Sequence, residues 1–430
     1  MLKTIIILYY YFKTKYFMRF ADRAALLKWQ NSRVTGFLRK YIAKSGYYSR
    51  KFRNMDVRNW QSFPTTDKKE MMENFDELNT VGISQKEAFE LALNSEKTRN
   101  FKPEINNITV GLSSGTSGNR GLFLVSRMER YRWVGIILAK TLPDSIFKKH
   151  RIAFFLRANS NLYTGVKSRN ISFEFFDLLD STDHNLKKLD EYKPSIIVSP
   201  PSMLKIIATN LNRISINPVK IISVAEVLEE LDRRYLEKAF NQTVHQIYQA
   251  TEGFLACTCR YGNLHINEDV LAVQREYVDK DKFIPVITDF SRTSQPVIRY
   301  RLNDILTESH EPCPCGSMCL RIAGIEGRCD DIFYLDSVDG SSSVAVFPDF
   351  LSRAVIYASD RIEEYKVIQN TRREILVYVD KTEEFIPVKE SLIKLFTVKK
   401  CQIPEIIQLK SLEIDRTKKF KRIESRIHDR

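Results

Sequence analysis

The chain has 430 residues, too many for one compact core, and its length therefore predicts two or three domains with a well-buried interior. A composition of 43% hydrophobic, 11% aromatic and 28% charged residues, with only 15 Gly and 14 Pro, excludes fibrous, low-complexity and fully disordered proteins. The net charge of +14 lies at the two ends, since residues 1–50 hold 11 Lys and Arg against one acid and residues 409–430 hold 8 against 4. A neutral body with basic ends favours a local anionic contact, such as a membrane surface or nucleotide phosphates, over a nucleic-acid-binding face.

Residues 1–53 have an aromatic and basic helical pattern. Tyr and Phe alternate with Lys and Arg between Tyr9 and Phe20, and residues 24–38 have helical periodicity. Two interpretations stay open: an amphipathic helix on an anionic membrane surface, and a helix packed on the body with a solvated basic face. The apolar run 5–12 is shorter than the roughly 20 residues that span a bilayer, and no small-residue cleavage site follows it. We therefore expect a cytoplasmic protein, with peripheral contact to the inner membrane surface as an option.

From residue 54 onward the pattern is that of an α/β protein. Thr66 or Asp67 is the expected N-cap of a following helix. Four short apolar runs have strand character and two longer stretches have helical character: 152–156, 172–176, 195–198, 221–224, and then 201–211 and 227–240. This alternation predicts a largely parallel sheet covered by helices. After residue 331 we expect a smaller α+β segment, with a strand over 374–380 and a helix over 388–399.

A glycine-rich loop follows the apolar strand predicted at 108–110. Its sequence is Ser113-Ser114-Gly115-Thr116-Ser117-Gly118-Asn119-Arg120-Gly121. Glycines let the backbone approach a ligand closely, and hydroxyl and N–H groups are donors suited to a polyphosphate. Asn119 stands where a Walker A loop requires Lys, so the loop is a phosphate-loop candidate of another kind. The alternative is an ordinary turn.

Four further motifs follow in order. They are Tyr248-Gln249-Ala250-Thr251-Glu252-Gly253, Pro296-Val297-Ile298-Arg299-Tyr300-Arg301-Leu302-Asn303-Asp304, Gly327-Arg328-Cys329-Asp330-Asp331 and Lys419-Phe420-Lys421-Arg422. Together with the loop, over roughly residues 60–425, this series resembles the adenylate-forming enzymes, which include acyl-CoA synthetases. Within them it resembles the branch of phenylacetate-CoA ligase, coenzyme F390 synthetase and CapK proteins.

The resemblance implies an α/β architecture and a domain division. A large adenylate-forming domain with parallel sheets covered by helices would occupy residues 54–327, after the basic segment 1–53. A small mobile α+β lid domain would occupy residues 328–430, with Asp330 at the hinge. ATP and Mg²⁺ would be the cofactors, with CoA as a candidate co-substrate.

The resemblance also implies roles in ATP binding. Ser113 to Gly118 would hold the β- and γ-phosphates, Thr251 would contact the α-phosphate, and Glu252 would bind Mg²⁺. Adenylation develops charge on phosphorus and on the departing pyrophosphate, which donors and a metal ion neutralise. The nucleoside would be held by three further residues: Asp304 on both ribose hydroxyls, Arg328 near the ribose or phosphate, and Tyr248 stacked on adenine.

The catalytic lysine departs from the family pattern. Family members present Gly-Lys before x-x-Arg, whereas a lysine stands in the Gly position here. Lys419 is chosen by its spacing from Arg422, and Lys421 is a rival. A second departure is the missing Lys after Gly118, for which Arg120 is a candidate substitute. A flexible ammonium that reaches phosphate and carboxylate oxygens suits this reaction.

Five of the seven cysteines fall in two tight groups on either side of a histidine: Cys257 and Cys259, His265, then Cys313, Cys315 and Cys319. Three thiolates and one imidazole would make a closed, tetrahedral structural zinc site. We predict the ligands Cys257, His265, Cys313 and Cys315, with Cys259 and Cys319 as alternates. Buried free thiols are the other interpretation.

These features predict ATP-dependent activation of an organic carboxylate to an acyl-adenylate with release of pyrophosphate, followed by transfer to CoA, an amine or a hydroxyl group. By resemblance, residues 199–202, 225–226 and 250 would line the acid pocket, and their types do not identify the acid. The rival interpretation is a non-catalytic nucleotide-binding protein, associated with the membrane surface or with envelope polysaccharide machinery. This rival interpretation stays open because the lysine motif is irregular and the lysine expected in the loop is missing.

Overall fold

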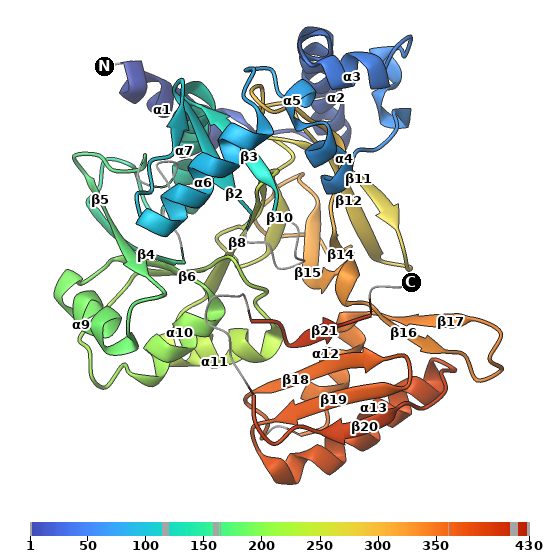
Figure 1. Ribbon diagram of the computed structural model, residues 1–430. Helices are drawn as coiled ribbons and strands as arrows, with labels where there is room; N and C mark the ends of the chain where they lie inside the picture. Colours follow the sequence, from blue (N-terminus) through green and yellow to red (C-terminus); the bar gives the residue numbers. More distant parts are fainter. Residues whose placement is uncertain are drawn as a thin grey trace. The chain divides into compact units, whose positions relative to one another are not determined.

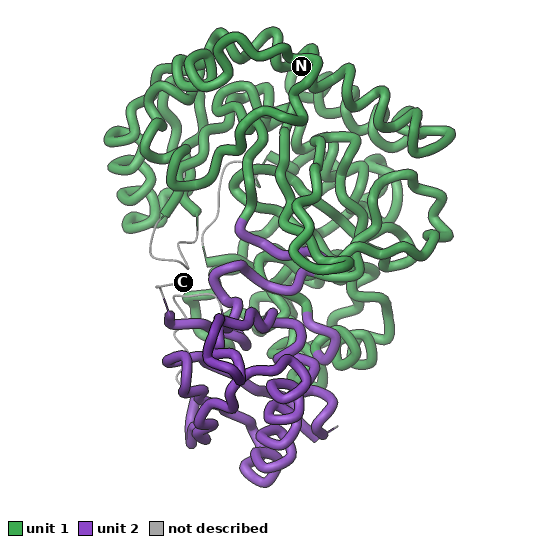
Figure 2. The backbone as a smooth tube through the Cα atoms, turned by 90° about the vertical axis from the view of Figure 1, so that its right-hand side faces the viewer, with its two compact units in different colours: residues 1–228, 232–302, 307–324 green, residues 229–231, 303–306, 325–430 purple. Residues whose placement is uncertain are grey.

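The computed structural model describes residues 2–113, 120–157, 163, 165–359, 361–412 and 420–427. The chain divides into two compact units (Figure 2). Unit 1 comprises residues 1–228, 232–302 and 307–324, and unit 2 comprises residues 229–231, 303–306 and 325–430. Strands β14 (Asp304–Glu308) and β15 (Arg321–Arg328) contain points at which the chain passes from one unit to the other. Each unit has buried apolar residues of its own.

The α-helices among the described residues up to 240 are α1 (Leu2–Phe12), α2 (Arg23–Tyr41), α3 (Gly46–Lys51), α4 (Lys68–Glu73), α5 (Phe75–Leu78), α6 (Gln85–Thr98), α7 (Arg127–Thr141), α9 (Thr182–Tyr192), α10 (Pro201–Thr209) and α11 (Glu230–Phe240). Asp67 is the N-cap of α4 and accepts a hydrogen bond from the Glu70 backbone N–H at 2.8 Å. The aspartate of the two predicted capping residues is therefore the one that begins this helix. No helix among the described residues combines the length and the apolar character that a bilayer crossing requires.

The predicted parallel sheet is confirmed in unit 1 (Figure 1). Its strands are β4 (His150–Leu156), β5 (Ile171–Asp177), β6 (Ile196–Ser199), β7 (Lys220–Ser223) and β8 (Val244–Ala250), in the spatial order β5-β4-β6-β7-β8. Alternate residues face opposite sides, so that Ile152 and Phe154 pack with α7 while Ala153 and Phe155 pack with α9 and α10. Burial on both faces explains why these strands are continuous apolar runs.

Beyond β8 the same sheet continues with antiparallel strands, which the sequence did not predict. They are β9 (Gly253–Thr258), β10 (Leu264–Ile266), β11 (Ala272–Tyr277), β12 (Lys282–Asp289) and β13 (Val297–Arg301), with β14 and β15 between β12 and β10. β8 and β9 pair antiparallel across a tight turn at residues 250–253. A separate antiparallel sheet contains β1 (Glu104–Ile105), β2 (Ile108–Leu112) and β3 (Leu122–Ser126).

The aromatic N-terminal segment is an integral part of unit 1. α1 packs against α7, and its buried residues Ile7 and Tyr11 join the cluster of Val134 and Leu138. A Cβ atom at Gly135 of α7 would lie 2.5 Å from the Ile7 carbonyl oxygen, so a glycine is needed for this close approach of the two helices. One side of α1 and of α2 therefore packs on the body of unit 1, as one of the two interpretations predicts.

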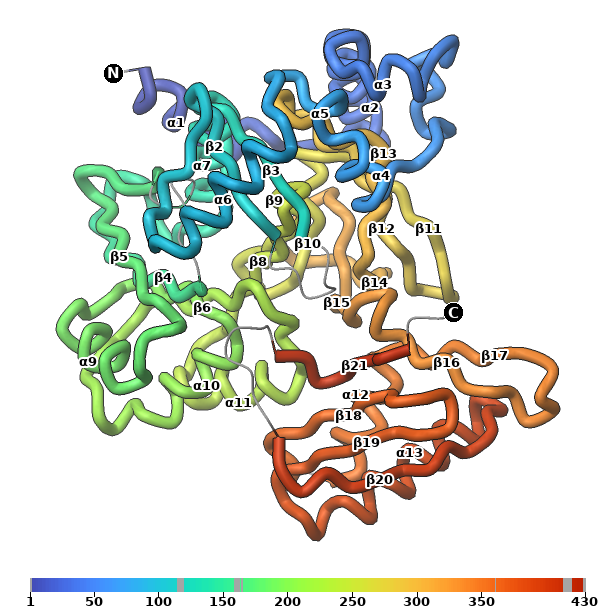
Figure 3. The backbone as a smooth tube through the Cα atoms, in the orientation of Figure 1, coloured from blue at the N-terminus to red at the C-terminus, as the bar shows by residue number. Residues whose placement is uncertain are grey.

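Unit 2 contains a mixed sheet with helices. Its elements are β16 (Phe333–Asp336), β17 (Ser343–Val346), α12 (Pro348–Ile356), β18 (Tyr365–Thr371), β19 (Glu374–Val379), α13 (Phe385–Val398), β20 (Glu405–Gln408) and β21 (Ile423–Ser425). The strand order is β20-β19-β18-β21, and β21, at the red end of the chain, runs parallel beside β18 (Figure 3). The predicted strand 374–380 and helix 388–399 correspond to β19 and α13.

Candidate functional site

The glycine-rich loop joins the two strands of the β2–β3 hairpin. Ser114 to Asn119 lie outside the described residues, whereas both ends of the loop are described. The Ser113 backbone N–H donates to the Gly121 carbonyl at 2.8 Å, and the Gly121 N–H donates to Ser113 Oγ at 2.7 Å. The hairpin therefore fixes the two ends of the loop against each other.

Arg120 braces the base of this loop. Its Nε donates to the Ser113 carbonyl at 3.0 Å, and its two terminal nitrogens donate to both carboxylate oxygens of Glu96 at 2.8 and 2.5 Å. A bidentate pair of this kind holds a guanidinium in one orientation. The role of Arg120 as a substitute for the missing loop lysine stays a prediction, and the structure gives this residue a structural contact instead.

A different lysine, which the sequence reasoning missed, faces the loop. Lys68 Nζ lies 3.5 Å from Ser113 Oγ, and the Lys68 side chain is the neighbour of Gly121. Lys68 is the first residue of α4, and the preceding Thr66 pairs with β13 through backbone hydrogen bonds of 2.9 Å to residues 299 and 301. The predicted helix start located Lys68 correctly, but its partner lies 45 residues away in the chain.

The turn at Thr251 and Glu252 is tied to the same hairpin by Arg292. Arg292 Nη1 donates to the Thr251 carbonyl at 2.9 Å, and Nη2 donates to the Leu124 carbonyl of β3 at 3.1 Å. The sequence reasoning missed Arg292 as well. It joins the turn that follows β8 to the strand that follows the glycine-rich loop. The structure thus brings two of the predicted motifs together within unit 1.

Glu252 faces a buried tyrosine of the third motif. Burial, together with the Glu252 carboxylate that accepts its hydrogen bond, holds the pKa of Tyr300 far above its ordinary value. The phenol therefore stays protonated and donates to Glu252. Tyr300 is buried in β13, the strand that pairs with Thr66 ahead of Lys68. β13 therefore contacts both the segment that carries Lys68 and the Glu252 carboxylate, and Lys68 in turn contacts Ser113 at the end of the loop.

Glu129 anchors the segment that follows Arg292. The buried Glu129 accepts hydrogen bonds from Ser294 Oγ at 2.6 Å and from the Ser294 N–H at 3.0 Å, and it forms a capping box with Ser126 at the start of α7. Burial alone would raise the pKa of Glu129, but Arg292 and these hydrogen bonds together lower it below its ordinary value. The carboxylate is therefore held as an anion, which interacts favourably with the charge of Arg292.

In unit 2 the structure brings Asp304 and Arg328 together. Arg328 Nε lies 3.8 Å from Asp304 Oδ1, at the start of β14 and the end of β15. Beside them, the Asn303 side chain donates to the Asp330 carboxylate. The Asn303 backbone carbonyl accepts a hydrogen bond from the Cys329 N–H at 2.9 Å. Three residues that the family resemblance singled out thus lie on adjoining segments of unit 2. Tyr248 lies in unit 1, in β8 next to an irregularity of register with β9.

Of the two candidate lysines, only Lys421 is among the described residues. Its Nζ donates to both oxygens of Asp331 at 2.9 Å, and the Asp331 carboxylate is buried. Burial raises the pKa of Asp331, and Lys421 opposes the shift. Lys421 therefore has a structural partner in unit 2, next to the predicted hinge residue Asp330. Lys419 lies outside the described residues.

The cysteine and histidine residues form one compact group. The ligand atoms of Cys259, His265, Cys313 and Cys315 all lie within 4.8 Å of one another. Cys259 Sγ is 3.7 Å from Cys313 Sγ, and Cys315 Sγ is 3.5 Å from His265 Nε2. Zinc–sulfur bonds of about 2.3 Å in a tetrahedron place sulfur atoms about 3.8 Å apart. The donor set and its spacing fit a structural zinc ion.

The structure places Cys257, one of the four predicted ligands, outside this group. Its thiol donates to Asn267 Oδ1 at 3.4 Å and packs in the apolar cluster of Ile136, Phe254 and Val270. Burial in that cluster raises the pKa of Cys257 to about 11. Cys259, one of the two alternates, follows the end of β9 and faces the Cys313 thiol. The other alternate, Cys319, contacts the group through its backbone carbonyl.

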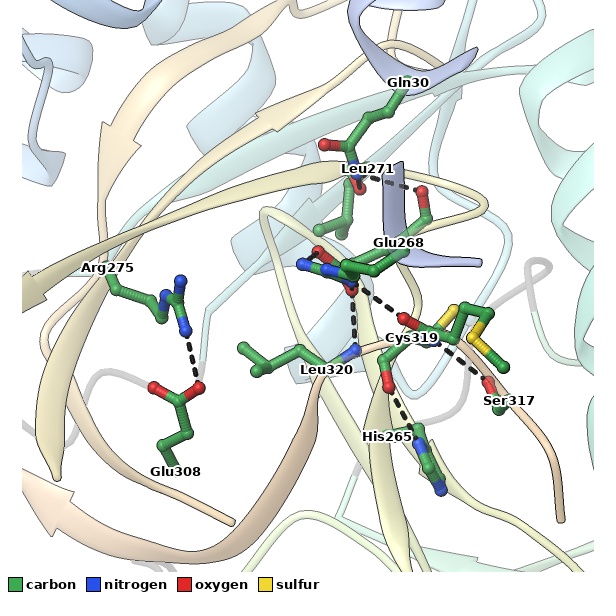
Figure 4. Close-up of polar contacts among 11 residues, drawn as sticks. Gln30, His265, Glu268, Leu271, Arg275, Glu308, Ser317, Cys319 and Leu320 are labelled. Carbon is green, nitrogen blue, oxygen red and sulfur yellow. Dashed lines mark hydrogen bonds and ion pairs between the residues drawn. The ribbon is translucent and has the colours of Figure 1, made fainter. Parts of the chain in front are cut away.

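A second layer of polar contacts orients this group (Figure 4). His265 Nδ1 lies 3.1 Å from the Cys319 carbonyl, which leaves Nε2 directed at the thiols. The buried Glu268 accepts the Leu320 N–H at 2.6 Å, so it fixes the segment that follows Cys315. Metal-bound histidines commonly donate their second nitrogen to a carbonyl in this way.

Helix α2 is the outer support of the same group. Arg23 donates to both oxygens of Glu268 and to the Met318 carbonyl, and Gln30 donates to the carbonyls of Glu268 and Leu271 at 3.1 Å. Figure 4 shows Gln30 above Leu271 and Glu268, and it includes the neighbouring Arg275–Glu308 ion pair. The basic N-terminal segment therefore contributes two residues that hold the cysteine-bearing loop.

The sequence is similar to two curated proteins. It is 27% identical to protein CapK of Staphylococcus aureus over 206 residues, which cover 46% of this chain and 45% of that protein. It is 22% identical to phenylacetate-coenzyme A ligase of Thermus thermophilus over 226 residues, which cover 47% of this chain and 49% of that protein. The chain thus spans about half the length of the curated relatives it matches. No model of a known protein family matches the chain.

The structure is similar to solved structures over most of its length. 2-Hydroxyisobutyryl-CoA ligase in the postadenylation state, in complex with 2-HIB-AMP, has a TM-score of 0.67 at 16% identity, covering 93% of this chain and 89% of that chain. The amide bond synthetase McbA from Marinactinospora thermotolerans has a TM-score of 0.55 at 11% identity, covering 73% and 68%. At these identities the likeness establishes the fold.

Proposed function

We propose that this chain, a member of the adenylate-forming superfamily, uses ATP to convert an organic carboxylate into an acyl-adenylate, with release of pyrophosphate, and then transfers the acyl group to an acceptor. The observation that carries the proposal is the linkage within unit 1 of the glycine-rich hairpin, Lys68, the turn at Thr251 and Glu252, and Arg292. Such a constellation of cation, carboxylate and backbone donors suits a reaction that develops charge on a triphosphate.

Each residue of this constellation has a role in the proposed reaction. The loop from Ser113 to Gly118 binds the β- and γ-phosphates, and Lys68 adds the cation that the loop itself lacks. Thr251 contacts the α-phosphate. Glu252, oriented by the Tyr300 hydroxyl, offers the carboxylate oxygens that Mg²⁺ prefers. The metal ion would neutralise charge on the phosphate oxygens when bound.

Three residues are proposed for the nucleoside and the acid. Tyr248 of β8 stacks on adenine. Asp304 of unit 2 accepts hydrogen bonds from both ribose hydroxyls, because a carboxylate offers two acceptor oxygens, and Arg328 Nε lies 3.8 Å from Asp304 Oδ1. Lys419 supplies the ammonium for the carboxylate and the α-phosphate, since Lys421 is engaged with Asp331.

We further propose that zinc is a structural component, bound by Cys259, His265, Cys313 and Cys315. The compact donor set and the orientation of His265 by the Cys319 carbonyl support this assignment. A closed four-ligand site leaves no open position for a substrate. Zinc would therefore stabilise the loop between β14 and β15 and take no part in adenylation.

The acceptor of the acyl group is proposed from the neighbours alone. 2-Hydroxyisobutyryl-CoA ligase has been solved with CoA and McbA is an amide bond synthetase, so a thiol and an amine are the two acceptors to test. The decisive experiment is a screen of carboxylic acids with ATP and Mg²⁺ that measures pyrophosphate. Acid-dependent pyrophosphate supports the enzyme. ATP binding without pyrophosphate release from any acid would favour the rival non-catalytic protein.

A further inference from the structure

Helix α1 has apolar residues on two faces, and only one of these faces is covered by the body. Ile7 and Tyr11 are buried against α7, where Gly135 permits close contact (Figure 1). A surface helix normally has one apolar stripe, and a helix that is apolar on all sides is normally enclosed. The second apolar face of α1 therefore needs a separate explanation.

The second face carries a series of exposed apolar residues. They lie on α1, on the π-helix Lys13–Phe17 that follows it and on the segment after α7: Leu2 (66% exposed), Ile5 (58%), Tyr9 (57%), Tyr16, Phe17 (77%) and Phe147 (64%). Phe12 links two of them, since its ring centroid lies 6.0 Å from that of Tyr16 and 6.1 Å from that of Phe147, and residues 2, 5, 9, 12 and 16 share one helical face by their spacing. We call these six exposed residues the α1 outer surface.

Hydrogen bonds hold the parts of the α1 outer surface together. The Tyr11 hydroxyl accepts the Ile146 N–H at 3.1 Å, and Lys15 Nζ donates to the Asp144 carbonyl at 2.8 Å. These contacts join α1 and the π-helix Lys13–Phe17 to the segment that carries Phe147. These hydrogen bonds fix the N-terminal segment against the segment that carries Phe147, so the α1 outer surface is part of the folded body.

The surroundings of this surface are strongly basic. Six cations lie on the same two segments, residues 2–20 and 143–149: Lys3, Lys13, Lys15, Arg19, Lys148 and Lys149. Asp144 is the single acid of these segments, and it forms an ion pair with Lys148 at 3.1 Å. Exposed aromatic and aliphatic side chains surrounded by cations match a bilayer with an anionic surface, because the rings enter the interface and the cations meet lipid phosphates.

We infer that the α1 outer surface docks on an anionic lipid bilayer. A second copy of the chain is the competing occupant. In a two-fold contact the same surface would meet itself, and the cations of both copies would face one another without a compensating acidic patch on these segments. Charge complementarity therefore selects lipid. The inference is independent of the proposed activity, because none of the residues named for adenylation lies on this surface.

The test uses the full-length protein and vesicles of phosphatidylcholine with or without phosphatidylserine. The protein should sediment with the anionic vesicles at low salt and be released as salt rises, and it should bind the neutral vesicles much more weakly. The double variant Lys3→Glu with Lys149→Glu should bind at least about 25-fold more weakly, at roughly 5-fold for each cation lost from the surface. Ile5→Ser with Phe17→Ser should weaken binding at every salt concentration.

Two control variants carry the same chemical changes on exposed residues elsewhere in unit 1. Lys86→Glu with Lys102→Glu matches the charge change, and Leu93→Ser with Tyr261→Ser matches the loss of one aliphatic and one aromatic side chain. Thermal unfolding of each variant checks that the fold is kept. Failure to sediment with anionic vesicles at low salt, or equal losses in the controls, would overturn the inference. Self-association that Phe17→Ser abolishes, without vesicle binding, would assign the surface to a second copy instead.

Discussion

Lys68 is the candidate phosphate-binding residue that the structure adds to those expected from the sequence. The sequence left the loop without the lysine that the resemblance implies, and Arg120 is engaged with Glu96. Lys68 occupies the neighbourhood of Ser113 and Gly121 from a separate segment of the chain. A charge that is supplied from elsewhere in the chain can serve the same phosphates, because a cation acts through its position and not through its place in a motif.

Replacement of Lys68 by methionine tests this role. Lys68→Met should lower kcat/KM for ATP in pyrophosphate release by about 10- to 100-fold, since a hydrogen bond to a charged group contributes about 1.5 to 3 kcal/mol. Lys69→Met is the matched control, because Lys69 is the next residue of α4 and its side chain is 83% exposed. Equal activity of the two variants would remove Lys68 from the phosphate site.

At the level of elements, the start of α7 links stability to the site. The capping box of Ser126 and Glu129 begins α7. Glu129 also accepts hydrogen bonds from the backbone N–H and the hydroxyl of Ser294. Because the pKa of Glu129 is lower in the folded state than in the unfolded chain, its contribution to stability is present above the unfolded pKa of about 4.5 and is lost as pH falls through the folded value.

This linkage gives a prediction for Glu129→Gln. The variant should unfold at lower temperature or denaturant concentration than the parent near pH 7, by about 1 to 3 kcal/mol, as for a buried hydrogen-bonded anion. The difference should shrink as pH falls below about 4.5, because the parent then loses the same ionised carboxylate. Denaturant unfolding at several pH values measures it. A difference that stays constant from pH 7 to pH 3 would show that the charge of Glu129 does not contribute.

A second element-level prediction distinguishes the two cysteines at the end of β9. Cys259→Ser should lose the zinc and melt earlier, whereas Cys257→Ser should keep it, because the Cys257 thiol lies in an apolar cluster beside Asn267. Metal analysis of protein purified without chelator, with about one zinc per chain in the parent, provides the readout. Retention of zinc by the Cys259 variant, or a metal-free and fully stable parent, would rule out the assignment.

Several elements could be predicted from the sequence because their signal is local. The apolar runs at 152–156 and 221–224 identified β4 and β7, since a strand buried on both faces is apolar throughout. The antiparallel strands after β8 have no comparable run of apolar residues in the sequence. Which strands pair depends on contacts between segments that are distant in the chain. The choice between Cys257 and Cys259 depended on which thiol faces Cys313, and spacing alone does not contain that information. Lys68, Arg292 and Tyr300 were missed for the same reason.

At the scale of the whole molecule, each unit carries some of the residues assigned to the proposed reaction. Unit 1 carries the glycine-rich hairpin and Glu252, and unit 2 carries Asp304 and the tail that contains Lys419. The family resemblance implies that the small domain moves between adenylation and transfer. In that scheme the Lys421–Asp331 ion pair holds the tail to the segment that contains the hinge.

The two lysines of the tail should therefore differ in their effects on the two half-reactions. Lys419→Ala should slow adenylation by about 10²-fold or more, on the scale of losing one preorganised electrostatic group, while transfer from a supplied acyl-adenylate stays nearly intact. Lys421→Ala should lower the stability of unit 2 and impair both half-reactions together. Loss of adenylation alone in the Lys421 variant would move the catalytic role to Lys421, and undiminished adenylation in both would remove the tail from the site.

The central claim, that the chain forms an acyl-adenylate, is tested most directly by acid-dependent exchange of labelled pyrophosphate into ATP. The exchange reports adenylation itself and needs no knowledge of the acceptor. We predict exchange with at least one carboxylic acid of the screen, none without acid, and a loss in Asp304→Ala that accompanies weaker ATP binding by about 1.5 to 3 kcal/mol in calorimetry. Absence of exchange with every acid, or ATP binding and exchange that Asp304→Ala leaves unchanged, would contradict the account.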